Sequence, residues 1–298
     1  MLFFSLLFCA VATSGLGLAD ASDDFLLVWG DASGQQHWDA RANDSAELPE
    51  CSERTLRQLR LRYFNGAEAV PRFALSSPVA QWNEERAIFS GDEFIHVAGQ
   101  CFTVVGGHWQ FCGIGGNLLL SDGVQVFLDV DMAQSFADEN WRDFAEEEEF
   151  TTISADNLKI SRCDGGLRLH FFGCVRAQTN NFTLSCQELS VGILFQFTPG
   201  VSERGQDGEE LIRHIAARGE ICVIVGEKSI FADEMELFPG ENAALFVGAM
   251  YLFGGEVHRG EQHIFFRDGQ CHAIWDGIDE MLSECSCGDF SQNAEGGH

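Results

Sequence analysis

Hydrophobic and polar residues alternate along much of this chain in short runs that are typical of β-strands. In residues 59–63, apolar side chains alternate with arginine, which predicts a half-exposed strand. Other short apolar runs are bounded by Gly, Asp or Ser, as strands commonly are. The predicted strands are residues 25–29, 59–63, 94–98, 101–105, 109–112, 118–120, 124–130, 158–160, 167–174, 182–186, 191–197, 221–225, 243–253, 263–266 and 271–275.

Glycine-containing segments separate several of these runs. Residues 98–100, 106–108 and 121–123 each place Gly between two apolar runs, which predicts hairpin turns there. Residues 30–49 are polar and are expected to form a loop, whereas residues 71–86 show no clear pattern.

One segment has the pattern of a helix. Asp207 is a plausible N-cap with Glu210 as its capping-box partner, and Gly219 would end the helix. The apolar positions on one face are Leu211, Ile212 and Ile215.

Many short strands with one helix predict an all-β fold, a two-sheet antiparallel β-sandwich with one short helix and a long acidic loop. No composition shift or linker divides residues 20–298, and no repeat of fixed period is found, so a single domain is expected there.

The charge of the chain is strongly negative. Asp and Glu number 46 against 18 Lys and Arg, which gives a formal net charge of −28. Nucleic-acid binding requires a basic surface, and an anionic membrane attracts one, so both partners are disfavoured. A basic protein is the natural complement of such a charge.

The acidic loop lies in residues 138–149. Its carboxylates are Asp138, Glu139, Asp143, Glu146, Glu147, Glu148 and Glu149. Four adjacent like charges repel one another and favour solvent, so the loop either keeps the protein soluble or faces a basic partner. Trp141 lies inside it and could anchor such a contact.

The N-terminal residues have the features of a secretory signal. Residues 2–12 are almost entirely apolar, and the small residues Gly17 and Ala19 precede Asp20. We therefore expect a signal peptide at residues 1–19. No later apolar run reaches the length of a membrane span, so a secreted, extracellular, soluble protein is expected.

The cysteines agree with secretion. Ten remain after the signal, and an even number in a secreted chain predicts up to five disulfides, whose pairing the sequence leaves open. They are Cys51, Cys101, Cys112, Cys163, Cys174, Cys186, Cys222, Cys271, Cys285 and Cys287. Asn43 and Asn181 begin glycosylation sequons.

No sequence motif indicates catalysis. The chain lacks the nucleophile elbow, the phosphate-binding loop, the dinucleotide fingerprint and the zinc-protease motif. The Gly30–Gly34 segment resembles a serine-hydrolase motif only superficially, because it lies in a polar segment without the flanking pattern that would place a catalytic base beside Ser33. Cys285 and Cys287 fit disulfide halves better than a zinc knuckle. We expect no enzyme activity, no cofactor and no metal site.

Several short motifs resemble those of a known family. They are the Gly-Gly-Leu-Arg-Leu run at residues 165–169 after the acidic loop, the Phe-Thr-Pro-Gly run at residues 197–200, the Glu209–Glu210 pair and the strand near Cys222. Across residues 125–226 their order resembles the poxvirus immune-evasion family. That family includes secreted type 2 CC-chemokine-binding proteins and the parapoxvirus inhibitor of GM-CSF and interleukin-2.

The resemblance implies a β-sandwich that binds host chemokines with one sheet face and the acidic loop, blocking receptor engagement. It implies ligand contacts from the acidic loop, Arg168 and Glu220. The alternative is a secreted inhibitor of GM-CSF and interleukin-2. The negative charge favours chemokines, because those cytokines are much less basic.

Overall fold

A computed structural model describes most of the chain between residues 25 and 281. The described residues are 25–30, 36–47, 53–65, 71–99, 101–113, 115–130, 132, 150–163, 166–180, 182–194, 211–225, 228–241, 243–248, 250–253, 256–259, 263–267, 270–275 and 278–281. The expected signal peptide and the acidic loop lie outside them.

Almost every described element is a β-strand. The elements are β1 (Phe25–Gly30), β2 (Gln36–Ala42), β3 (Asp44–Glu47), β4 (Glu53–Asn65), β5 (Phe73–Asn83), β6 (Ile88–Gly91), β7 (Ile95–Gly99), β8 (Phe102–Cys112), β9 (Asn117–Leu128), β10 (Thr151–Cys163), β11 (Gly166–Gln178), β12 (Phe182–Leu194), β13 (Leu211–Val225), β14 (Lys228–Phe238), the 3-10 turn η3 (Pro239–Glu241), β15 (Ala243–Val247), β16 (Met250–Phe253), β17 (Glu256–Arg259), β18 (His263–Arg267), β19 (Gln270–Trp275) and β20 (Ile278–Met281).

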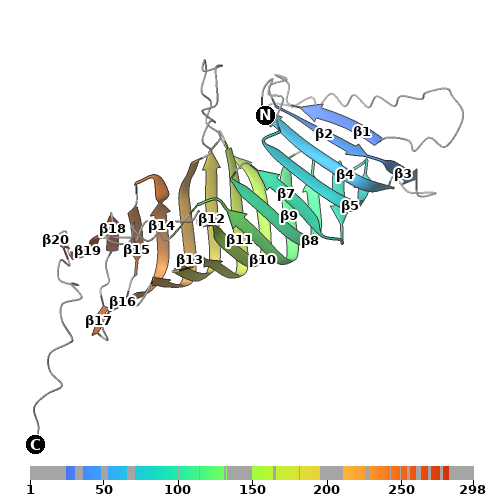
Figure 1. Cartoon of the computed structure of the whole chain (residues 1–298). Coiled ribbons are helices and arrows are strands. Elements are labelled where there is room, and N and C mark those ends of the chain that lie inside the picture. Colours follow the sequence, from blue (N-terminus) through green and yellow to red (C-terminus); the bar gives the residue numbers. More distant parts are fainter. Residues whose placement is uncertain are drawn as a thin grey trace, which may run out of the picture.

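All these strands belong to one antiparallel sheet, in which strands close in sequence are neighbours in space (Figure 1). From β8 to β14 each strand pairs with the next one along the chain. At three places in the sheet, two short strands stand end to end where one long strand would fit. β2 and β3 both pair with β4, β6 and β7 both pair with β5 and β8, and β15 and β16 both pair with β14. The antiparallel all-β prediction is confirmed, and the layers belong to one continuous sheet.

The long strands are irregular near their middles. In β10 the buried residues Ala155 and Leu158 are three positions apart, and in β11 Phe171 and Val175 are four apart, whereas a regular strand would bury every second residue. The pairing register shifts at the same points, which marks β-bulges. In each strand the apolar side chains on both sides of the extra residues face the same way.

These irregularities align across the sheet, and we call them the bend line. Its residues are Asn43, Gln58, His108, Asp122, Asp156, Gly173, Gln187, Gly219, Asp233 and Gly248. Polar side chains contact one another along it: Asn43 Nδ2 donates to Gln58 Oε1, and His108 Nδ1 lies 3.3 Å from Asp122 Oδ2.

The apolar face encloses one hydrophobic core, because the sheet curls over itself. Trp38 of β2 packs on Phe111 of β8 with 4.8 Å between ring centroids, although β4, β5 and the β6–β7 pair separate these strands in the pairing order. Trp29 Nε1 donates to Gly113 O at 3.0 Å across the same layers. The fold is therefore sandwich-like.

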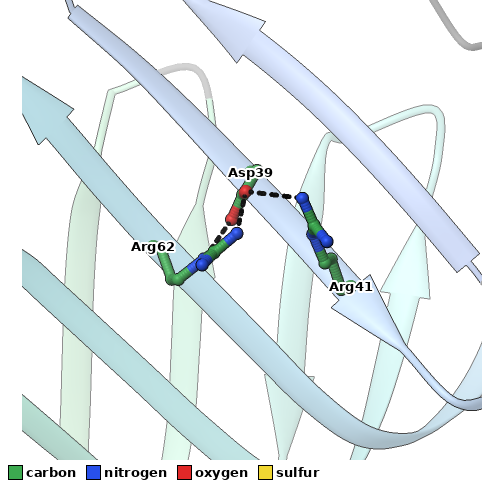
Figure 2. A network of polar contacts seen from close by, with 3 residues as sticks. All are labelled: Asp39, Arg41 and Arg62. Carbon is green, nitrogen blue, oxygen red and sulfur yellow. Dashed lines mark hydrogen bonds and ion pairs between the residues drawn. The ribbon is translucent and has the colours of Figure 1, made fainter. Parts of the chain in front are cut away.

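An ion-pair network fixes the outer side of the first strands (Figure 2). Asp39 of β2 is buried, with 7% of its surface exposed. It accepts a hydrogen bond from Arg62 Nε at 2.8 Å and a second from Arg62 Nη2, and Arg41 Nη2 lies 3.5 Å away. The hydrogen bond to Asp39 raises the pKa of the Arg62 guanidinium, because it stabilises the charged form.

The predicted helix after residue 207 is wrong in its described part, since residues 211–225 form β13. Ile212 and Ile215 do share a face, as the helix prediction required. They do so because a register shift against Gly192 and Ile193 inserts Arg213 between them as a bulge. A bulged strand thus reproduced the three-residue spacing of a helix.

Other boundaries also change. The predicted turns at residues 106–108 and 121–123 are bulges inside the single strands β8 and β9. The predicted loop at residues 30–49 contains β2 and β3, and the unassigned residues 71–86 contain β5. Within the described ranges, no helix has the length and apolar character needed to cross a membrane.

The bend line predicts a specific stability defect. Gly173 has φ of +78°, and a Cβ there would lie 2.6 Å from Asp156 Oδ2. We expect Gly173→Ala to lower the free energy of unfolding by about 1–2 kcal/mol, measured by urea denaturation.

The matched control is Gly107→Ala, also at a bulge. Its Cβ would meet only Asp92 O at 3.9 Å, and its φ lies outside the left-handed region. Equal destabilisation by both substitutions would show that the left-handed backbone at the bend line carries no special cost.

Candidate functional site

A groove with a basic lining lies on the outer face of β11, β12 and β13, and we call it the cationic groove. It has a volume of about 650 Å³. Its lining residues are Cys163, Arg168, His170, Glu188, Leu189, Ser190, Gly192, Leu194, Arg213, His214, Ala216 and Arg218. Five of these carry cationic or imidazole side chains and one carries a carboxylate.

Strand register places the walls of the groove. Arg168 of β11 lies opposite Gly192 of β12, and Gly192 lies opposite His214 of β13. Two strand spacings of about 4.8 Å therefore separate the Arg168 and His214 backbones, and glycine forms the floor between them. Ser190 and Ala216, one step further along, keep the floor shallow.

The bulge at Arg213 concentrates charge on one wall. Neighbouring strand residues normally point to opposite faces, yet Arg213 and His214 both line the groove, while Ile212 and Ile215 on either side are buried. His214 packs against Phe238 of β14 at 5.3 Å between ring centroids, which fixes the imidazole against the wall.

Three of the five basic side chains have carboxylate neighbours. His170 Nε2 lies 3.6 Å from Glu188 Oε2, His214 Nε2 lies 3.8 Å from Glu236 Oε2, and Arg218 Nε lies 3.8 Å from Glu234 Oε1. Arg168 and Arg213 have no carboxylate within ion-pairing distance in the part of the chain that the structure describes.

A second feature lies at the other ends of these strands, and we call it the apolar row. Large apolar side chains there face solvent on the outer side of β9, β13 and β14 and just before β10. They are Phe127 (40% exposed), Phe150 (52%), Ile224 (44%) and Phe231 (36%). The acidic loop, residues 138–149, is joined to this end of the sheet because it connects β9 to β10.

Arg168 and Glu220, two of the residues that the resemblance grouped together, lie at different places on the outer face. Arg168 lines the cationic groove and pairs with Ser161 of β10, ten residues from Thr151 where the acidic loop returns. That is about 33 Å along the strand. Glu220 is exposed at the bend line, six residues beyond His214 on β13, so it lies outside the groove. The loop carboxylates themselves lie outside the described residues.

Only one of the two predicted glycosylation sites lies within the described residues. Asn43 is exposed in the turn between β2 and β3. Asn181 lies outside the described residues, between the described Asn180 and Phe182.

The disulfide framework of the ten cysteines stays a prediction. Free thiols are found at Cys112, Cys163, Cys174, Cys186 and Cys222. Cys186 faces the core while Cys222, opposite the neighbouring Ser185, points to the other face, so these two cannot bridge without backbone movement. Cys101 is buried, and the side chains of Cys51, Cys271, Cys285 and Cys287 lie outside the described residues.

Metal-binding geometry is not found in the described ranges: no three His, Cys, Asp or Glu side chains there converge on one point.

The family resemblance predicted Arg168 as a chemokine contact, which stays a prediction, and the sequence did not point to the other basic residues of the groove. His170, Arg213 and His214 are scattered through two apolar strands, and only the register of β11, β12 and β13 brings them together. The apolar row had a weak signal, since Phe127 and Phe150 flank the acidic loop in sequence.

The chain has no match among protein-family models, curated proteins or solved structures.

Cysteine reactivity gives a test of the core. Burial raises the pKa of the Cys186 thiol to about 12, whereas Cys174 is exposed at the bend line. We expect iodoacetamide at pH 8 to label Cys174 in the folded protein and to label Cys186 only after unfolding, as measured by peptide mass spectrometry.

Since the Cys186 pKa is higher in the folded chain, raising the pH above the ordinary thiol value of 9.0 should favour unfolding.

A Cys174 that reacts only after reduction would contradict the labelling expectation and support the disulfide prediction. Rapid native labelling of Cys186 would contradict its placement in the core.

Proposed function

We propose that the protein is a secreted, non-enzymatic decoy that binds basic host proteins of the chemokine class through the outer face of its sheet. The observation that carries the proposal is the apolar row beside the attachment of the acidic loop. Exposed aromatic residues next to a strong charge are the elements of a steered protein interface. The viral origin and the chemokine class rest on the family resemblance.

The apolar row reaches from β9 to β14, and the polar residues Thr152, Gln178 and Thr183 occupy the outward positions between its two ends. Phe127 on β9 and Phe231 on β14 are separated by five strand spacings. At about 4.8 Å each, they lie about 24 Å apart along the sheet. A standard interface buries about 800 Å² per partner, so one small protein can span the row.

The acidic loop supplies the complementary charge. Its consecutive carboxylates attract a basic partner over about one Debye length, roughly 8 Å at physiological ionic strength. Charges of this kind raise the association rate, while the aromatic contacts slow dissociation.

The proposal is tested by a surface-binding screen of the purified protein. The panel holds CC, C and CXC chemokines together with GM-CSF and interleukin-2, in physiological salt. Nanomolar binding to chemokines is expected. Binding only to GM-CSF or interleukin-2 would replace the ligand class, and no binding to any member would refute the proposal.

Neutralising the acidic loop tests steering. We expect the combined change of Glu146, Glu147, Glu148 and Glu149 to Gln to slow chemokine association several-fold at low salt and much less at high salt, measured by surface plasmon resonance. Unchanged association at low salt would mean that the loop only keeps the protein soluble.

Truncating the apolar row tests the contact surface. We expect Phe127→Ser to weaken chemokine binding at least ten-fold, mainly through faster dissociation, because exposed aromatics of this kind form interface hot spots. The matched control is Leu119→Ser, since Leu119 is 41% exposed on the same face of β9 but beyond the bend line. Equal loss in both variants would place the interface elsewhere.

A further inference from the structure

The cationic groove has a charge balance opposite to that of the whole chain. Asp and Glu outnumber Lys and Arg by 46 to 18 in the sequence, yet the groove lining contains three Arg and two His beside a single Glu. Glu188, Glu234 and Glu236 each lie beside one basic side chain. Arg168 and Arg213 have no carboxylate within ion-pairing distance among the described residues.

The backbone between these two arginines is open. Gly192 forms the floor, and a Cβ added there would meet only His214 O, at 3.6 Å. Arg168 stands on the strand to one side of Gly192 and Arg213 on the strand to the other. With about 10 Å between the walls, two long guanidinium side chains can converge on one group held above the glycine.

We propose that the cationic groove binds a tetrahedral oxyanion, the phosphate or sulfate group of a ligand, above Gly192 between Arg168 and Arg213. A planar carboxylate is satisfied by one bidentate arginine, whereas a tetrahedral anion presents oxygens to donors on both walls. Ser190 and Arg218 continue the groove and can contact polar groups attached to the anion.

The net negative charge of the chain does not prevent this binding. At physiological ionic strength, charges separated by more than about 8 Å are largely screened, so nearby guanidiniums dominate the local potential. The site is also independent of the proposed protein interface, because the apolar row lies across the bend line at the opposite strand ends.

Calorimetric titration and thermal-shift measurements on the full chain test the proposal. Inorganic phosphate, inorganic sulfate and glycerol phosphate are compared with acetate at equal ionic strength. Saturable binding of the tetrahedral anions with little response to acetate is expected. Equal responses to glycerol phosphate and inorganic phosphate assign the site to the anion itself, and a tighter response to glycerol phosphate assigns it to an ester. Acetate binding as tightly as phosphate, or no saturable binding, would overturn the proposal.

Substitutions then locate the site. Arg168→Gln and Arg213→Gln should each weaken phosphate binding at least ten-fold. Arg176→Gln, the same charge change on the same face of β11 but beyond the bend line, should alter it less than two-fold. A loss as large in Arg176→Gln would mean that only net charge is being sensed.

Gly192 provides a further pair of variants. Gly192→Asp places a carboxylate between the two arginines and should abolish phosphate binding, whereas Gly192→Ala should retain it. Circular dichroism confirms that each variant is folded. Retained binding in a folded Gly192→Asp protein would contradict the proposed position of the anion.

Discussion

A β-strand points successive side chains to opposite faces, so a strand that bends around a core must insert residues to keep its apolar side chains inside. The bend line meets this requirement in strand after strand. Strands with one inserted residue, such as β10 at Asp156, alternate with strands that insert two, such as β11 at Gly173 and its neighbour. Because each bulge must face the next, the position of one fixes the register of its neighbours. The core, the outer face and the surfaces on it all depend on this alignment.

The bend line also divides the outer face. On one side the strands end in the apolar row, beside the ends of β9 and β10 that the acidic loop connects. On the other side they carry the cationic groove, where guanidinium groups line a glycine floor. Inward-facing positions are held to apolar residues by the core, so chemical variety is confined to the outward positions of each strand. The apolar row and the cationic groove therefore lie on one continuous sheet without sharing residues.

The sequence predicted the fold class because alternation is preserved within each half-strand, as in residues 59–63. It could not predict strand lengths, since bulges and hairpin turns both use glycine and left-handed backbone. The segment at Asp122 and Gly123 therefore looked like a turn but lies inside β9. Ile212 and Ile215 looked helical because the bulge at Arg213 gives these two apolar residues a spacing of three. The cationic groove was not predicted from the sequence, because the cross-strand register that brings Arg168 and Arg213 to either side of Gly192 is a tertiary property.

The pairing of strands that are close in sequence has a consequence for how the chain acquires its structure. Each hairpin forms by closing a short loop. The newly formed edge strand then offers its free backbone groups to the next strand, so the sheet can assemble strand by strand along the chain. The two long connections, after β9 and after β12, interrupt this progress only slightly, because the entropy of loop closure grows with the logarithm of loop length. For the same reason, a chain emerging from the ribosome could add strands in order of synthesis, with the exposed edge strand as the transient point of vulnerability to aggregation.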